Sequence, residues 1–230
     1  MQLGFVVALT DEAKSLGSGF LQGNVADRNQ IEICGPGHAN ASLAAQRLLK
    51  NGARGLVSWG TCGGLDAMLK PGSIGIYEAT INAAGERYEC NREWRDRVMQ
   101  TLTPVNPQLV SGFDSATTIA TSREKIDLAT RFGCRVVDME SGAIGQQAHR
   151  SGVPYVAIRV VVDPIDFEMP HAALQALENG GQAQIWPVVK GIIRRPQELP
   201  ALLRLAYWYR ISLNKLRLSA KLLQPNFSAN

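Results

Sequence analysis

Fully apolar runs of strand length alternate with helix-length segments of polar and small residues along most of this chain. Runs without polar positions indicate strands buried on both faces, as parallel sheets require. The alternation predicts one doubly wound or related α/β domain. Strands are predicted at residues 3–9, 31–34, 55–60, 73–78, 109–112, 136–138 and 153–163. One helix is predicted to begin at Thr10, and another, rich in small residues, is predicted to end at Lys50. Further helices are predicted at 92–102, 122–132 with Ser122 as the cap, 141–152 and 185–193.

Two segments break this pattern. Residues 79–89 are polar and are predicted to be irregular, and residues 164–179 form a connection that follows the last predicted strand. Lids over binding sites are commonly built from such connections. The segment 164–179 is therefore a candidate for covering a site at the end of that strand.

Acidic residues follow the two apolar segments at 136–138 and 153–163. Asp138 and Glu140 come at the end of the first segment, and Asp163 comes at the end of the second. In an open α/β sheet the carboxyl ends of the strands line the crevice where ligands bind. We therefore expect these acids to lie at one edge of the sheet. Glu12 also follows a buried strand, but its position equally suits the start of a helix, where the macrodipole favours acids.

Glycines follow two further predicted strands. Gly35 and Gly37 precede a small-residue helix, and Thr61 and Gly63 follow the apolar run 55–60. Glycines permit a tight turn and close approach of the backbone to a ligand. Asn40 replaces the third glycine of the dinucleotide fingerprint, so that motif is absent.

Composition narrows the class of protein. Hydrophobic residues make up 45% of the 230 residues and charged residues 19%, which is typical of a globular enzyme. The four cysteines are dispersed, and the three histidines share no metal-ligand spacing, so neither a metal site nor a cofactor is expected. The chain lacks a secretory leader pattern and an apolar run that could span a bilayer, and we expect it in the cytoplasm.

Positive charge is concentrated near the C-terminus. Residues 190–223 hold eight basic residues and one acid, whereas the whole chain has a net charge of +4. Apolar residues recur there in steps of four and three, which predicts a basic amphipathic helix. We therefore divide the chain into a catalytic domain at 1–195 and a helical extension at 196–230. Residues 196–224 either contact an anionic membrane or pack on the domain or on a second copy. Nothing resembles a motif for reading nucleic acid.

Short segments also occur in the order and spacing of one known family. They are Ala-Leu-Thr-Asp-Glu at 8–12, Gly-Pro-Gly-His-Ala-Asn-Ala at 35–41, Gly-Thr-Cys-Gly-Gly-Leu at 60–65, Asp-Met-Glu-Ser at 138–141, and Arg159 with Asp163. Over roughly residues 1–190 the chain resembles the nucleoside phosphorylase and nucleosidase family, which includes purine and uridine phosphorylases and methylthioadenosine/adenosylhomocysteine nucleosidases. The Asp-Met-Glu-Ser form and the basic C-terminal segment are most similar to the hopanoid-associated phosphorylases, which act on adenosylhopane.

The resemblance implies a single-domain, three-layer α/β/α fold with a mixed, mostly parallel central sheet. It implies release of adenine from a 5′-substituted adenosine by a homo-oligomeric enzyme. Cleavage of an N-glycosidic bond builds positive charge on the ribose and negative charge on the purine, so it needs an acid for the base and a carboxylate near the sugar. The family pattern makes Asp163 and Glu12 the catalytic residues.

The same family pattern assigns a role toward the substrate to each of these residues and to several others. Asp163 would protonate or hydrogen-bond the purine, Glu12 would orient or deprotonate the nucleophile, and Asp138 would support the site. Residues 113–119 would contribute to the adenine pocket. The expected substrate-binding residues are Glu140, Met139, Thr61, Gly63 and Gly37.

The nucleophile is either water or phosphate. Phosphorolysis normally uses arginine forks beside glycine-loop amides, and the arginines outside the C-terminal segment sit in no recognisable phosphate-loop motif. Glu12 would repel phosphate, so the sequence favours water and leaves phosphate as the alternative co-substrate. Two other interpretations are a methylthioadenosine/adenosylhomocysteine nucleosidase or general purine nucleoside phosphorylase, and a non-catalytic nucleoside-binding or membrane-adaptor protein.

Overall fold

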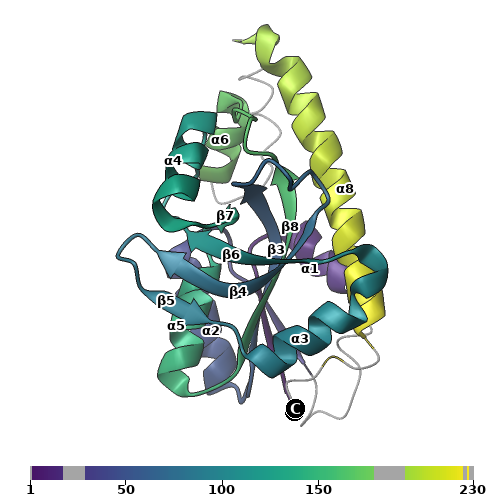
Figure 1. The fold of residues 1–230 in the computed structure, drawn as a ribbon. Helices are drawn as coiled ribbons and strands as arrows, with labels where there is room; N and C mark the ends of the chain where they lie inside the picture. Colours follow the sequence, from purple (N-terminus) through teal and green to yellow (C-terminus); the bar gives the residue numbers. More distant parts are fainter. Residues whose placement is uncertain (1, 18–28, 179–194, 225–226, 228–230) are drawn as a thin grey trace.

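The computed structural model describes residues 2–17, 29–178, 195–224 and 227, and shows a central sheet covered by helices (Figure 1). The strands are β1 (Gly4–Val7), β2 (Gln30–Ile33), β3 (Leu56–Gly64), β4 (Ile74–Asn82), β5 (Arg87–Glu89), β6 (Gln108–Asp114), β7 (Val136–Asp138) and β8 (Tyr155–Asp163). The helices are α1 (Thr10–Leu16), α2 (His38–Lys50), α3 (Arg92–Thr101), α4 (Ser122–Phe132), α5 (Ser141–Ser151), α6 (His171–Glu178) and α8 (Leu199–Leu223), with 3₁₀ turns at Thr103–Val105 and Pro196–Glu198.

The sheet is mixed and mostly parallel, as expected. Its order is β2-β1-β3-β7-β6-β4-β5, and β8 pairs with both β3 and β4. Strands β3, β8, β4, β6 and β7 therefore form a closed ring of pairings. The pairs β1 with β2, β1 with β3, β3 with β8, β4 with β6 and β6 with β7 are parallel. The closure brings the carboxyl ends of β3, β6, β7 and β8 to one end of the ring.

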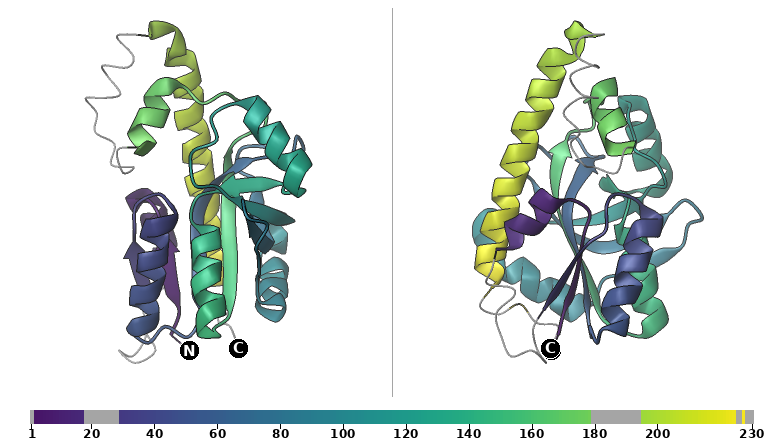
Figure 2. Two further views of the ribbon diagram at one scale, coloured as in Figure 1. Left: turned by 90° about the vertical axis from the view of Figure 1, so that its left-hand side faces the viewer. Right: turned by 180° about the vertical axis from the view of Figure 1, so that it is seen from behind.

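Helices cover both faces of the sheet, which confirms the three-layer arrangement. Helices α2 and α5 lie side by side on one face, and α1, α3 and α8 lie on the other (Figure 2). Small residues of α2 allow the close packing, because Ala41, Ala44 and Ala45 are fully buried. The opposite face is filled by larger side chains, including Trp59 and Trp94.

The C-terminal helix α8 belongs to this core over its second half. Leu213, Leu216, Ala220 and Leu223 are buried among residues of β1, β3 and α3. These are the apolar positions from which the sequence predicts an amphipathic helix, and they face the protein. Among the helices that the structure describes, none combines the length and apolar character needed to cross a membrane.

Several local predictions were wrong. Residues 79–89 are not irregular, since β4 continues to Asn82 and β5 pairs with it in a hairpin. The connection 164–179 contains helix α6. The first turn of α4 is capped by Thr121, whose side chain accepts from the backbone N–H of Glu124, and not by Ser122. Thr61 and Gly63 lie within β3, which runs on to Gly64 because it continues to pair with β8 and β7. The predicted helix at 185–193 lies outside the described residues.

Candidate active site

A cavity of about 1020 Å³ opens at the carboxyl ends of β3, β7 and β8 and of the neighbouring β1 and β2. The loop before α1, the segment 117–119, α6 and the first half of α8 complete its wall. The structure brings seven of the eight predicted site residues into this wall: Glu12, Thr61, Gly63, Asp138, Met139, Glu140 and Asp163. The eighth, Gly37, is not part of the lining but contacts Glu140.

Glu12 is held in the first turn of α1 with its carboxylate fully buried. One oxygen accepts hydrogen bonds from the backbone N–H of Thr61 at 2.8 Å and from its hydroxyl at 2.6 Å, and the other accepts from the N–H of Leu9 at 3.1 Å. Burial raises the pKa of Glu12, while Arg159 and the Thr61 bonds oppose the rise. A side chain on Gly60 would collide with this group, because a Cβ there would lie 2.9 Å from Glu12 Oε2 and 2.9 Å from Arg159 Nη1.

Glu140 precedes α5 and is also buried. Its Oε1 accepts a hydrogen bond of 3.0 Å from the backbone N–H of Gly37, and its Oε2 lies 3.2 Å from Arg159 Nη1. Gly37 adopts a φ of 104°, which favours glycine and points its N–H at the carboxylate. Burial raises the pKa of Glu140; Arg159 opposes this rise and the nearby Asp138 adds to it. The Gly37 turn thus positions a carboxylate.

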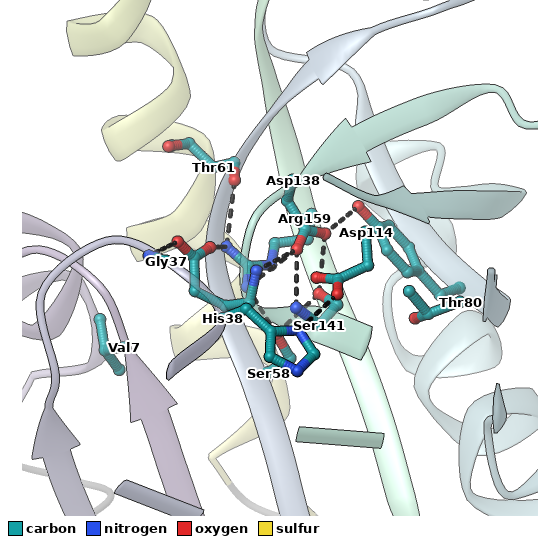
Figure 3. A network of polar contacts seen from close by, with 12 residues as sticks. Val7, Gly37, His38, Ser58, Thr61, Thr80, Asp114, Asp138, Ser141 and Arg159 are labelled. Atoms are coloured by element: carbon teal, nitrogen blue, oxygen red, sulfur yellow. Dashed lines mark hydrogen bonds and ion pairs between the residues drawn. The ribbon is translucent and has the colours of Figure 1, made fainter. Parts of the chain in front are cut away.

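Arg159, on β8, is the cation at the centre of these acids (Figure 3). Its side chain is 1% exposed. It donates to the Ser58 hydroxyl at 2.6 Å and to the Thr61 carbonyl at 3.1 Å, and it lies 3.7 Å from Asp138. A buried guanidinium with its charge balanced by carboxylates is rigid, because removing one partner would leave an uncompensated charge.

Each carboxylate oxygen of Asp138 already accepts two hydrogen bonds from the protein. One oxygen accepts from the backbone N–H groups of Glu140 and Ser141, and the other accepts from the hydroxyls of Tyr77 and Ser141, each at 2.7 Å. These bonds fix the start of α5 and hence the backbone of Glu140. The arrangement suits the supporting role predicted for Asp138, since four donors already occupy its oxygens.

Asp163 ends β8 and is paired with a residue that the sequence did not single out. Its Oδ2 accepts a hydrogen bond of 2.6 Å from the Lys125 ammonium of α4. Burial raises the pKa of Asp163, and the Lys125 ammonium opposes that rise. Gly63 packs against this carboxyl, since a Cβ there would lie 3.4 Å from Oδ2. The Asp163 carboxyl therefore lines the cavity and also contacts Lys125, which is not part of the lining.

Two sides of the cavity differ in polarity. Near the acids, Met139 contacts the Thr118 hydroxyl through its sulfur at 3.6 Å, and Thr117 and Ile119 continue the wall. These residues lie within the segment predicted to form the base pocket. The remaining wall is apolar and comes mostly from α6 and α8: Met169, Ala172, Ala173, Leu199, Leu202, Leu203, Leu205, Ala206 and Tyr209.

Acidic residues outnumber basic residues around the cavity. Arg159 is the one lysine or arginine among the described residues that line it, whereas five acids do: Asp11, Glu12, Asp138, Glu140 and Asp163. Within the described part of the chain no cluster of histidine, cysteine or acidic residues has the geometry of a metal site. The arrangement can stabilise a developing cation next to Glu140 and can transfer a proton at Glu12 and at Asp163.

Comparison with known proteins assigns the family. The model of the phosphorylase superfamily matches residues 12–190, and the chain therefore belongs to that superfamily. This confirms an enzyme of the class that cleaves glycosidic bonds, as the sequence motifs predict. A search of curated proteins finds no match.

Solved structures show the same fold. A 5′-methylthioadenosine/S-adenosylhomocysteine nucleosidase from Neisseria meningitidis, in complex with methylthio-immucillin-A, is similar with a TM-score of 0.73 at 16% identity, covering 97% of this chain and 99% of that one. The corresponding nucleosidase of Campylobacter jejuni gives 0.71 at 12% identity, covering 98% and 97%. Futalosine hydrolase of Helicobacter pylori gives 0.66 at 14% identity, covering 84% and 97%.

Sequence reasoning missed some of the polar residues around the site. Arg159 was predicted only as part of a family motif, and no sequence pattern assigned a role to Lys125, Ser58 or Tyr77. A signal for Lys125 existed, because it falls at helical spacing with Leu128, Ala129 and Phe132, which pack under the sheet edge. A lysine on the apolar face of a helix needs a buried partner. Nothing in the sequence indicated that the partner is Asp163.

Proposed function

We propose that this enzyme hydrolyses the N-glycosidic bond of a 5′-substituted adenosine and releases adenine. The observation that carries the choice of water is the charge of the cavity, with one arginine against five acids. Phosphate is multiply charged and needs free cationic groups, but Arg159 is already engaged by carboxylates. Arg47, Arg87 and Arg92 are engaged elsewhere, in the pairs Arg47 with Glu32, Arg87 with Glu89 and Arg92 with Asp96.

The reaction follows from the positions of three carboxyl groups. Glu12 accepts a proton from water as the water oxygen bonds to C1′ of the ribose. The C1′–N9 bond breaks, its electron pair leaves with the base, and Asp163 delivers a proton to N7. Glu140 binds the ribose hydroxyls and stabilises the cationic sugar, with Met139 against the ribose face and Thr61 and Gly63 as further contacts. Burial raises the pKa of Glu12, which makes its carboxylate a stronger base than a solvent-exposed one.

The apolar wall suggests what hangs from the 5′ carbon. Ligand pockets commonly occupy about 300–1,000 Å³, and this one reaches about 1020 Å³ with leucines of α8 along one side. A large apolar 5′ group would be buried against that wall. Adenosylhopane, which carries a polycyclic lipid, is the substrate we favour, and it would place the enzyme in hopanoid biosynthesis. This choice also rests on the resemblance of the Asp-Met-Glu-Ser segment to the hopanoid-associated subgroup.

A second substrate is favoured by the structural comparisons. Several similar structures are methylthioadenosine/adenosylhomocysteine nucleosidases, so 5′-methylthioadenosine is the alternative, with general purine nucleoside phosphorolysis as a third choice. In those cases the apolar wall would serve packing alone.

One assay separates these functions. The protein is incubated with adenosylhopane in detergent, with 5′-methylthioadenosine and with adenosine, each with and without phosphate, and free adenine and the sugar product are measured. We expect free adenine and an unphosphorylated sugar from the lipid-linked substrate, at a rate that phosphate does not change. A requirement for phosphate, with formation of a sugar 1-phosphate, would contradict hydrolysis. Absence of adenine from every substrate would contradict the enzyme proposal.

Two neighbouring acids give a matched test of Glu12. Glu12→Gln should lower kcat by roughly 10²- to 10⁴-fold, because the general base is lost. Asp11 follows the same strand but is exposed and pairs with Lys14, so Asp11→Asn should leave kcat within about twofold. Equal losses in both variants would show that the effect is not specific to a general base.

The first half of α8 is the part of 196–224 that we propose meets an anionic membrane. Leu199, Leu203 and Tyr207 are spaced by four residues and are 39%, 63% and 64% exposed, and the exposed Arg204 and Arg210 lie on the same half of the helix. Leu199 and Leu203 also line the cavity, so the contact would place its mouth at the lipid surface of the cytoplasmic leaflet. The enzyme would act there as a homo-oligomer, as the family resemblance implies.

A further inference from the structure

Lys125 is a buried lysine whose three donors are all used. Its side chain is 1% exposed. The ammonium donates to Asp163 Oδ2 at 2.6 Å, to the Pro164 carbonyl at 2.8 Å and to the Phe167 carbonyl at 3.0 Å. The three acceptors match the three N–H groups of an ammonium.

The three bonds reach two functional parts of the site. One holds Oδ2 of Asp163, so Oδ1 is the carboxyl oxygen that Lys125 does not bond. The other two hold the start of the connection from β8 to α6, whose residues Met169 and Ala172 line the cavity. Lys125 itself is not part of the lining. It lies behind Asp163 and cannot touch the substrate.

We propose that Lys125 is a positioning residue for the leaving group: it selects which oxygen of Asp163 faces the purine and ties that carboxyl to the connection that closes the cavity. The proposal rests on the proposed function, in which Asp163 protonates the base. A lysine in this position also sets the proton affinity of the carboxyl, because a cation at 2.6 Å favours the ionised form.

A pH profile distinguishes this role from mere packing. The groups that act on Asp163 are the Lys125 ammonium of α4 and, across the strand pair, the Cys62 thiol of β3. If Asp163 must be protonated to donate, kcat/KM falls as pH rises through its pKa. Removing the ammonium raises that pKa, so the fall moves to higher pH. A residue needed only for packing would lower activity without moving the profile.

The experiment compares Lys125→Met with Lys125→Arg and with Lys50→Met, which removes an exposed lysine of α2. With 5′-methylthioadenosine as substrate, Lys125→Met should lower kcat by roughly 10²-fold, change KM by less than about threefold, and move the fall of kcat/KM up by about one pH unit or more. Lys125→Arg should restore the pH position, and Lys50→Met should match the wild type. An unchanged kcat and profile in Lys125→Met would overturn the proposal.

Asp163→Asn supplies a second test. A residue that acts through Asp163 has nothing to act on in this background, so Lys125→Met should slow Asp163→Asn by less than about twofold. A loss as large as that seen in the wild type would overturn the proposal. Where Lys125→Met does not fold, Lys125→Gln decides in its place: it also removes the ammonium, so it should lower kcat and move the fall of kcat/KM to higher pH, and an unmoved fall would overturn the proposal.

A failure of the proposed function would be recognised separately. If the wild type releases no adenine from any substrate, the pH dependence of thermal unfolding still tests the pair. With the ammonium gone, the Tm deficit of Lys125→Met should widen as pH rises from 4 to 8, because Asp163 then ionises without a partner. This widening should be absent in the Asp163→Asn background. A deficit that does not change with pH would contradict control of Asp163 by Lys125.

Discussion

Asp114, at the carboxyl end of β6, shows how a buried carboxyl couples to pH. One oxygen lies 2.8 Å from His38 Nδ1, and the other is buried with no hydrogen-bond partner among the described residues. Burial raises the pKa of Asp114 to about 6, the charge on Asp138 adds to the rise, and the His38 contact opposes it. Gly142 leaves room for this carboxyl, since a Cβ there would lie 2.5 Å from it.

Asp114→Asn should therefore stabilise the protein at high pH. A folded-state pKa above the unfolded value means that stability is greatest below about pH 4 and is lost as pH rises through 6. A rise from 3.8 to about 6 corresponds to a cost of about 3 kcal/mol for ionised Asp114. The variant should gain up to about that amount at pH 8 and nothing near pH 4, as measured by urea unfolding. A gain that is equal at both pH values would show that ionisation is not the cause.

For single residues, the sequence predicted where the acids lie but not which side chains pair with them. Asp138, Glu140 and Asp163 follow apolar runs, so their place at a sheet edge was predictable from strand direction. Lys125 lies 38 residues from Asp163 along the chain, and Asp114 lies 76 residues from His38. Pairs so far apart meet only through strand order and register, which hydrophobic periodicity does not specify.

Among the elements, α8 serves two purposes along one helix. Its second half fills the core through Leu213, Leu216 and Leu223, and its first half forms the apolar wall of the cavity and an exposed stripe. The sequence predicted the helix and its apolar face. The sequence left open whether that face contacts protein or lipid, because an apolar stripe at helical spacing is favourable in either environment. Deleting the helix would therefore remove core as well as any membrane contact.

Two leucines of α8 separate these purposes. Leu216 is fully buried, so Leu216→Ala should lower the free energy of unfolding by about 2–5 kcal/mol through loss of burial and formation of a cavity. Leu203 is 63% exposed, and Leu203→Ala should change it by less than about 0.5 kcal/mol. Urea unfolding measures both. A large loss at Leu203 would mean that the first half of α8 is covered by a part of the protein or by a second copy.

Binding to vesicles tests the exposed stripe. Tyr207→Ser removes an exposed residue of the stripe that does not line the cavity, so it should lower binding to anionic liposomes severalfold while leaving turnover of 5′-methylthioadenosine unchanged. Co-sedimentation measures the binding, and neutral liposomes provide the control. If the wild-type protein does not sediment with anionic liposomes, the membrane proposal fails.

For the whole molecule, the closed ring of strands makes one anionic cavity with an apolar extension. A ligand that binds the folded state alone stabilises it by about 2.7 kcal/mol at a hundred times its Kd. If the proposed nucleosidase function holds, methylthio-immucillin-A, the ligand of the similar Neisseria structure, should therefore raise Tm by roughly 5–10 °C. Phosphate at the same concentration should leave Tm within about 1 °C, because Arg159, the one lysine or arginine among the described residues lining the cavity, is already paired with carboxylates. An equal rise with phosphate would favour phosphorolysis over hydrolysis.

The sequence by itself determined the class of fold, the family and, apart from β5 and α6, the order of most elements, because these depend on local apolar runs and short motifs. Asp163 and its fellow acids could be placed at one sheet edge for the same reason. Only the tertiary structure decided that Lys125 stands behind Asp163, that Arg159 balances Glu140, and that half of α8 is core. Each of these depends on which strand pairs with which, and in what register, so that charges distant in sequence become neighbours in a buried site where they must be matched.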